Sequence, residues 1–153
     1  MTKVVKGVLI AAIIVAALIA TGMGVLVGAG IYGWKHAVRA GNEAAAVQNV
    51  RTIQAAEMRY FDTRRQQFVT FPQLVAEQML DSRFAADTPL VDGYRFKLNL
   101  ASDNTSGLHS FTLHADPESS SAGTKHFYVD SKDWTIRVNP KQPATASDPP
   151  FLD

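Results

Sequence analysis

Four histidines are the residues of this chain best suited by type to bind a metal ion or transfer a proton: His36, His109, His114 and His126. His109 and His114 lie five residues apart in a segment expected to be a strand, so they face opposite sides of it. No two histidines have the i, i+4 spacing of a helical zinc site. The sequence therefore predicts no metal site.

Other catalytic motifs are missing from the sequence as well. There is no cysteine, which excludes disulfides, thiolate nucleophiles and thiolate metal ligands. GxSxG, phosphate-binding glycine loops and EF-hand patterns are also absent. Asp130 and Asp133 flank Lys132 in an expected hairpin turn, where aspartate is favoured for conformational reasons rather than for calcium binding. We expect a protein that is not an enzyme and needs no cofactor.

An apolar segment near the N-terminus determines the expected domain organisation. About 28 residues from Gly7 to Trp34 carry no charge. As a helix they would measure ~40 Å, more than the roughly 30 Å core of a bilayer. The apolar part of a signal peptide is shorter, about 7–15 residues. We expect a basic leader-like segment over 1–7, a transmembrane helix over 8–34 and a folded domain over 35–153.

Small residues recur at every fourth position of this segment: Ala12, Ala16, Ala20, Gly24 and Gly28. In a helix this spacing places them along one slowly rotating face. The last two form a GxxxG pair, which permits close approach of another helix backbone. Alanine and glycine are also common in membrane helices, so a helix–helix packing face and ordinary anchor composition both remain open.

Charge outside the leader argues against nucleic acid as a partner. Without Lys3 and Lys6 the chain has thirteen basic and fourteen acidic residues, so it lacks the basic excess of a nucleic-acid surface. Basic residues also follow the apolar segment, at Lys35 and Arg39. The positive-inside rule is therefore nearly balanced, and charge alone does not decide the orientation.

The segment after the apolar stretch is expected to continue as an amphipathic helix. From Asn42 to Phe68 there is no glycine or proline. Its apolar residues fall close to one helical stripe: Ala46, Val47, Val50, Ile53, Ala56 and Phe61. The stretch "TFPQLVAEQML" predicts a short second helix, with Thr70 as N-cap and Pro72 in the first turn.

The second half of the chain has the period of two that is typical of strands. Four short strands are expected in "GYRFKLNL", "LHSFTLHA", "HFYVD" and "WTIRV", joined as an antiparallel meander. The amphipathic helix would cover the apolar face of this sheet, which gives an α+β fold. The proline-rich tail from Asn139 predicts a surface segment held by Phe151 and Leu152.

Several segments together resemble a known family. These are the leader "MTKVVKG", the long apolar stretch, the block "NEAAAVQNVRTIQAAEMRY", the hairpin "FYVDSKDWTIRV" and the tail "SDPPF". They resemble type IV pilin-like proteins, the class of the pilins and the pseudopilins of type II secretion. The resemblance implies a long N-terminal helix, with a membrane half and an amphipathic half, packed on a four-stranded antiparallel sheet.

The resemblance also implies how the protein is processed and where it resides. A prepilin peptidase would cut between Gly7 and Val8, with N-methylation of Val8. The domain would lie in the periplasm or in an extracellular filament, and the apolar segment in the bacterial inner membrane. Two positions depart from the family pattern. Val8 replaces the usual phenylalanine or methionine, and Ala12 stands where the mature helix usually has glutamate.

Two functions follow from these features. The first is a structural subunit or minor component of a type IV pilus or type II secretion pseudopilus, assembled through its N-terminal hydrophobic helix. Its partners would be the membrane, other pilin-like subunits, the prepilin peptidase and an inner-membrane assembly platform. The alternative is an uncleaved single-pass membrane protein whose pilin-like domain binds or senses a ligand, and the departures at Val8 and Ala12 favour it.

Overall fold

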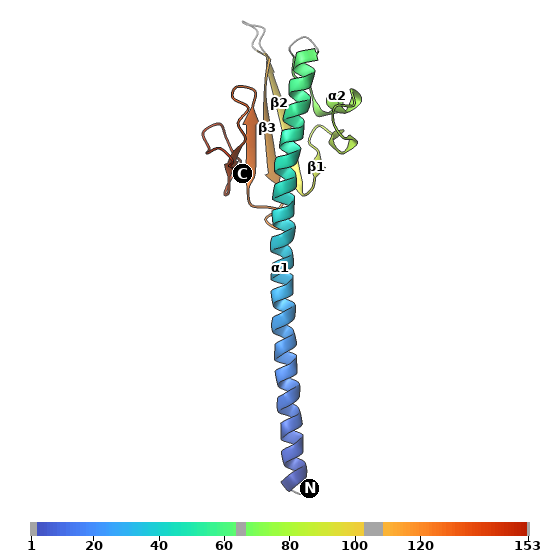
Figure 1. The fold of residues 1–153 in the computed structure, drawn as a ribbon, viewed down its shortest axis with the longest axis vertical. Helices are drawn as coiled ribbons and strands as arrows, with labels where there is room; N and C mark the ends of the chain where they lie inside the picture. Colours follow the sequence, from blue (N-terminus) through green and yellow to red (C-terminus); the bar gives the residue numbers. More distant parts are fainter. Residues whose placement is uncertain (1–2, 64–66, 103–108, 153) are drawn as a thin grey trace. The chain divides into compact units, whose positions relative to one another are not determined.

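The computed structural model describes the side chains of residues 33–63, 67–102 and 109–152. The chain divides into two compact units, 1–37 and 38–153. The second unit contains a helix, a five-stranded sheet and two short helical segments (Figure 1). The elements in chain order are α1 (Lys3–Thr63), α2 (Phe71–Ala76), η1 (Ser82–Phe84), β1 (Leu90–Val91), β2 (Tyr94–Ser102), β3 (His109–Pro117), β4 (His126–Asp130) and β5 (Arg137–Asn139).

The sheet corrects the sequence prediction. All strands are antiparallel and follow the order β1-β2-β3-β4-β5, so the expected four-stranded sheet is wrong. The missed strand, β1, has two residues, too few to show a period of two. It turns back into β2 through Asp92 and Gly93, whose φ angles of 51° and 78° fit the tight turn of a two-residue hairpin.

The last hairpin also differs from the prediction. The strand expected to start at Trp134 starts at Arg137, which pairs with Tyr128. Trp134 has a φ of 58°, in the left-handed region, which is incompatible with strand geometry. Alternating apolar residues alone could not reveal this conformation.

The membrane half of the expected fold is not shown either. Within the described parts of the chain, no helix is long and apolar enough to span a membrane. The physical reason is charge: from Gly33 onward, α1 carries Lys35, Arg39 and Glu43 at short intervals. The side chains of residues 8–32 lie outside the described part. The boundaries 1–7, 8–34 and 35–153 therefore remain predictions.

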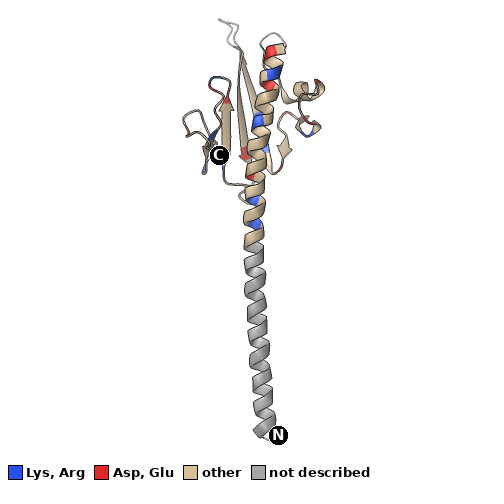
Figure 2. Cartoon of the chain, in the orientation of Figure 1, with Lys and Arg blue, Asp and Glu red and all other residues tan. Residues whose placement is uncertain are grey.

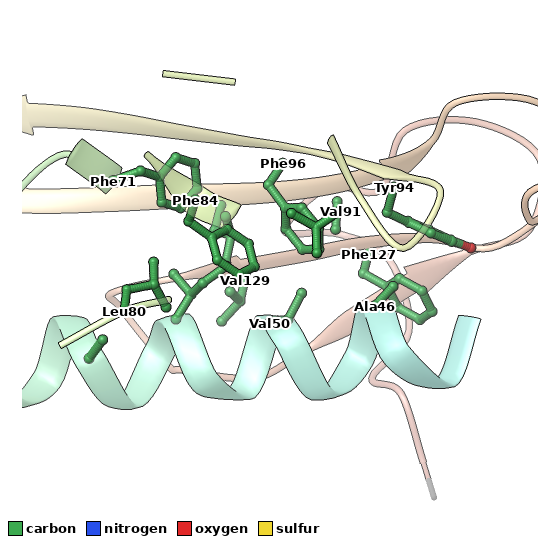
Figure 3. Packing of buried hydrophobic residues seen from close by; sticks show 14 of the residues in the cluster. Ala46, Val50, Phe71, Leu80, Phe84, Val91, Tyr94, Phe96, Phe127 and Val129 are labelled. Carbon is green, nitrogen blue, oxygen red and sulfur yellow. The ribbon is translucent and has the colours of Figure 1, made fainter. Parts of the chain in front are cut away.

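The core forms between α1 and one face of the sheet. Ala46, Val47, Val50, Ile53 and Ala56 are all buried, which confirms this part of the predicted helical stripe, whereas Phe61 is only half-buried. Figure 3 shows Ala46 and Val50 pointing from α1 toward Phe96 and Phe127. Alternation along the strands supplies the other side of the core, with Phe96, Phe111, Leu113, Phe127 and Val129 buried.

The region around α2 closes one end of this core. Thr70 is the N-cap, as predicted, and its backbone N–H donates to Gln73 Oε1 at 3.0 Å. Phe71 and Phe84 are buried and lie close to each other, their ring centroids 6.1 Å apart. The helix is shorter than the pattern indicated, because the chain ends it at Ala76 and Gln78 takes a left-handed φ of 57°.

The C-terminal tail is held against the sheet by one of its two predicted residues. Phe151 N–H donates to Ile136 O at 2.7 Å, and its ring lies edge-on to Phe127 at 5.7 Å. Leu152 remains 82% exposed, so its predicted role in holding the tail is wrong. A bridge between Arg137 and Pro150 adds to this attachment and covers the outer edge of β5.

Candidate interaction surface along helix α1

The residues predicted to act in processing and helix packing lie outside the described side chains. They are Gly7, Val8, Ala12, Ala16, Ala20, Gly24 and Gly28. Cleavage and helix–helix packing at these positions stay predictions. The described part of the molecule offers a different surface, the side of α1 that faces away from the sheet.

This outer side of α1 combines small residues with long basic ones. Ala44, Gln48, Arg51, Ala55 and Arg59 are all exposed. Their spacing of three or four residues places them on neighbouring turns along the helix. Figure 2 shows basic and acidic residues along this part of α1, but the acid Glu57 is buried, so the exposed charges on this side are Arg51 and Arg59. The surface is therefore closely approachable at the alanines and able to form ion pairs beside them.

A groove runs along one flank of this surface and is called here the β4 groove. It encloses about 310 Å³. Val47, Phe127 and Phe151 give it an apolar floor, and Glu43 and Lys125 form its polar rim. The remaining lining residues are Ala40, Ala44, Gln48 and Arg51.

Glu43 holds the rim of the β4 groove in place through hydrogen bonds and an ion pair. Its Oε1 accepts hydrogen bonds from Thr124 N at 2.9 Å and Thr124 Oγ1 at 3.0 Å. Lys125 Nζ lies 3.2 Å from its Oε2. Burial raises the pKa of Glu43, but the Thr124 hydrogen bonds and Lys125 outweigh burial and hold that pKa below its ordinary value. The carboxylate is therefore charged at neutral pH and occupied by these partners.

A second groove follows the opposite flank, beside the segment after α2. It is lined by Gln48, Arg51, Thr52, Ala55, Ala56, Arg59 and Met79. Gln48 and Arg51 line both grooves, so the ridge between them is the helix itself. A partner that straddles this ridge would contact both flanks at once.

Polar side chains of α1 tie the helix to loops at both ends of the sheet. Asn42 Nδ2 donates to Ala122 O at 3.0 Å, and Gln54 Nε2 donates to Trp134 O at 2.8 Å. Asn49 Nδ2 donates to Asp92 Oδ2 at 3.0 Å. Sequence reasoning missed these residues, because their partners lie far away in the chain. They hold the exposed ridge of α1 at a set rotation over the core.

Glu57 is the one carboxylic acid among the described residues that is wholly inaccessible to solvent. Its Oε2 accepts a hydrogen bond from Val69 N at 3.2 Å, whereas Oε1 has no partner among the described residues. Burial raises the pKa of Glu57 to about 8, against the smaller opposing effect of the Val69 hydrogen bond. At neutral pH the side chain is therefore mostly the uncharged acid.

The four histidines lie on α1, β3 and β4. Within the described residues, no three histidine or acidic side chains are arranged to hold a metal ion. His36 is exposed on α1, and His126 Nδ1 lies 2.6 Å from Asp116 Oδ1. Burial lowers the pKa of His114, which packs edge-on against Tyr128 at 5.1 Å. The contacts of His114 and His126 join the neighbouring strands β3 and β4.

The turn after β4 is stabilised by its aspartates. Asp130 Oδ1 accepts from Lys132 N at 2.9 Å and Asp130 Oδ2 from Tyr128 Oη at 2.9 Å. Asp133 accepts from Thr135 N at 2.9 Å and pairs with Arg137 at 2.5 Å. Both carboxylates are engaged by protein donors, which is the geometry of a structured turn.

Comparison with known proteins adds no relative. No family model, no curated protein and no solved structure matches this chain.

Proposed function

We propose that this chain is a structural subunit or minor component of a type IV pilus or a type II secretion pseudopilus. It would reside in the bacterial inner membrane through its N-terminal apolar segment, with the remaining domain in the periplasm or in the filament. The role is mechanical assembly without catalysis. Its partners would be other pilin-like subunits, a prepilin peptidase and an inner-membrane assembly platform.

The observation that carries this proposal is the uncovered ridge of α1. Packing of α1 against its own sheet does not require small residues on the exposed side of the helix. Here Ala44 and Ala55 are exposed between basic residues, and a groove lies on each flank. Small residues permit close packing of a neighbouring subunit, and the basic residues beside them would attract acidic groups of that subunit. The resemblance of the N-terminal segments supports the same proposal.

Ala44→Arg tests the ridge as an assembly contact. The side chain is exposed, so the domain should keep its thermal stability, while a long charged residue would block close approach. We expect loss of filaments or of subunit crosslinking in cells. Ala86→Arg is the matched control, because Ala86 is exposed on the segment before β1. Normal assembly of the Ala44 variant would contradict the proposal.

Intact mass of the protein purified from membranes tests the processing step. Loss of Met1–Gly7, with methylation of the new N-terminus, is expected for a filament subunit. The alternative function is an uncleaved single-pass protein with a binding or sensing domain, and the valine and alanine at positions 8 and 12 favour it. A chain that retains Lys3 and Lys6 would support that alternative.

A further inference from the structure

Strand β2 has one edge that its neighbour covers only in part. β3 pairs with β2 along its whole length, from Tyr94 to Ser102. On the other edge, β1 pairs only with Tyr94 and Arg95. The last bond on that side runs from Phe96 N–H to Pro89 O, at 2.9 Å. Beyond Phe96, no strand within the described part of the chain pairs with this edge.

Alternation identifies the backbone groups that this edge presents. In an antiparallel sheet, successive residues direct their N–H and C=O groups to opposite neighbours. Since Phe96 bonds toward the β1 side, Leu98 and Leu100 direct their N–H and C=O groups to the same side. Leu100 is 42% exposed, and Asn99 beside it is exposed too. The edge is therefore a row of donors and acceptors that no described strand pairs with and that an extended strand would satisfy.

The side chains along this edge differ between the two faces of the sheet. Leu98 and Leu100 lie on the core side, in line with buried Phe96. Lys97, Asn99 and Ala101 lie on the outer side and are exposed. A strand added here would meet apolar residues on one face and a single charge on the other.

We propose that a second copy of this chain occupies the edge, with the two β2 strands antiparallel about a two-fold axis through Asn99. Leu98 of each copy then lies opposite Leu100 of the other, and the two pairs form four inter-strand hydrogen bonds. Lys97 lies opposite Ala101, so no like charges face each other. The same segment contacts itself, which is how two-fold dimers close.

This register is the one that best matches the residues present. It places leucine against leucine twice on the core side, and apolar cross-strand pairs stabilise a sheet. An axis through Leu100 would place Leu98 opposite Ser102. An axis through Leu98 would require Phe96, whose N–H is already bonded to Pro89. The contact uses the sheet edge and not α1, so it does not depend on the function proposed above.

The absence of cysteine permits a direct test on the full-length protein in detergent. Asn99→Cys would place two thiols in a non-hydrogen-bonded pair, about 4.5 Å apart between Cα atoms. A disulfide accepts Cα separations of about 4.4–6.8 Å. We expect a disulfide-linked dimer after mild oxidation at low protein concentration. Lys97→Cys is the matched control on the same face, because its two copies would be ~13 Å apart.

A proline provides the second variant. Leu100→Pro removes an N–H that points to the open edge and leaves the β3 hydrogen bonds in place. Each copy loses one inter-strand hydrogen bond, so the dissociation constant of the dimer should rise about tenfold. Sedimentation experiments would measure this constant. Leu100→Thr keeps the N–H and should weaken the dimer less. Circular dichroism would report whether each variant is folded.

The outcomes separate the possibilities. Efficient crosslinking of the Asn99 variant alone supports the proposed pairing. Equal crosslinking of both cysteine variants indicates random collision and overturns it. The proposal is also overturned if neither variant forms a disulfide-linked dimer. It is likewise overturned if the Asn99→Cys variant forms its disulfide with another protein. Leader cleavage is read separately by intact mass, so failure of one proposal is distinguishable from failure of the other.

Discussion

Glu57 is a fully buried acid on α1. The only hydrogen bond it accepts from the described residues comes from Val69 N, which is too little to replace the hydration of a carboxylate. Its pKa of about 8 means that the folded domain retains a proton that the unfolded chain releases near 4.5. The residue therefore links stability to pH.

The sign of this linkage follows from the proton count. Between pH 4.5 and about 8 the folded state binds more protons than the unfolded state, so stability falls as pH rises. The total loss is on the order of a few kcal/mol. Urea unfolding at a series of pH values should show this decline, and Glu57→Gln should remove most of it. An unchanged pH dependence in the variant would contradict the assignment.

Gly123 occupies a position where a side chain has no room. A Cβ built there would lie 2.2 Å from Tyr94 Oη, and Tyr94 Oη donates to Lys125 O at 2.9 Å. Tyr94 is fully buried, so its ring cannot swing away without disturbing the core. Gly123→Ala should destabilise the domain by about 1–3 kcal/mol.

Gly41→Ala is the natural comparison for this substitution. An added Cβ at Gly41 meets nothing within 4 Å. Because Gly41 lies within α1, alanine should stabilise the helix by about 0.5–1 kcal/mol. Thermal unfolding of the two variants should therefore shift in opposite directions, and a shift in the same direction would count against this account of Gly123.

At the scale of the elements, α1 is held by the stripe it buries. Ile53 and Val50 are fully buried, whereas Met58 is 46% exposed on the same helix. Ile53→Ala should cost about 2–4 kcal/mol, because it leaves a cavity against the sheet. Met58→Ala should change the free energy of unfolding by less than about 0.5 kcal/mol. Chemical denaturation of the two variants measures both losses, and similar losses would contradict a helix rotation that buries Ile53 and exposes Met58.

At the scale of the whole molecule, the attachment of the C-terminal tail can be tested by substitution. Phe151 joins the last residues of the chain to β4 through its contact with Phe127. Phe151→Ala should destabilise the domain by about 1–3 kcal/mol and make the tail more sensitive to protease. Leu152→Ala should have little effect, since Leu152 is mostly exposed. Equal protease sensitivity of the two variants would argue against the attachment.

The proposed surfaces lie on different parts of the domain. The ridge of α1 faces away from the sheet, while the open edge of β2 belongs to the sheet itself. Association at one surface therefore leaves the other available. Together they would allow a subunit to contact one neighbour by helix packing and another by strand pairing, with separate mutations to disable each.

Local periodicity was enough to predict much of the domain. The stripe through Val50 and Ile53 repeats within a single helix, so it shows in the sequence before any partner is known. The strands β2 and β3 show a period of two for the same reason, and Thr70 caps α2 through its immediate neighbours. These features depend on residues a few positions apart.

Only the tertiary structure decided the rest, because those features depend on residues far apart in the chain. β1 is a strand only because it pairs with β2. Glu57 has a raised pKa only because folding buries it, with the segment at Val69 beside it. The open edge at Leu100 exists because β1 stops pairing at Pro89. Composition and spacing contain no record of such contacts, since burial and pairing arise when distant segments meet.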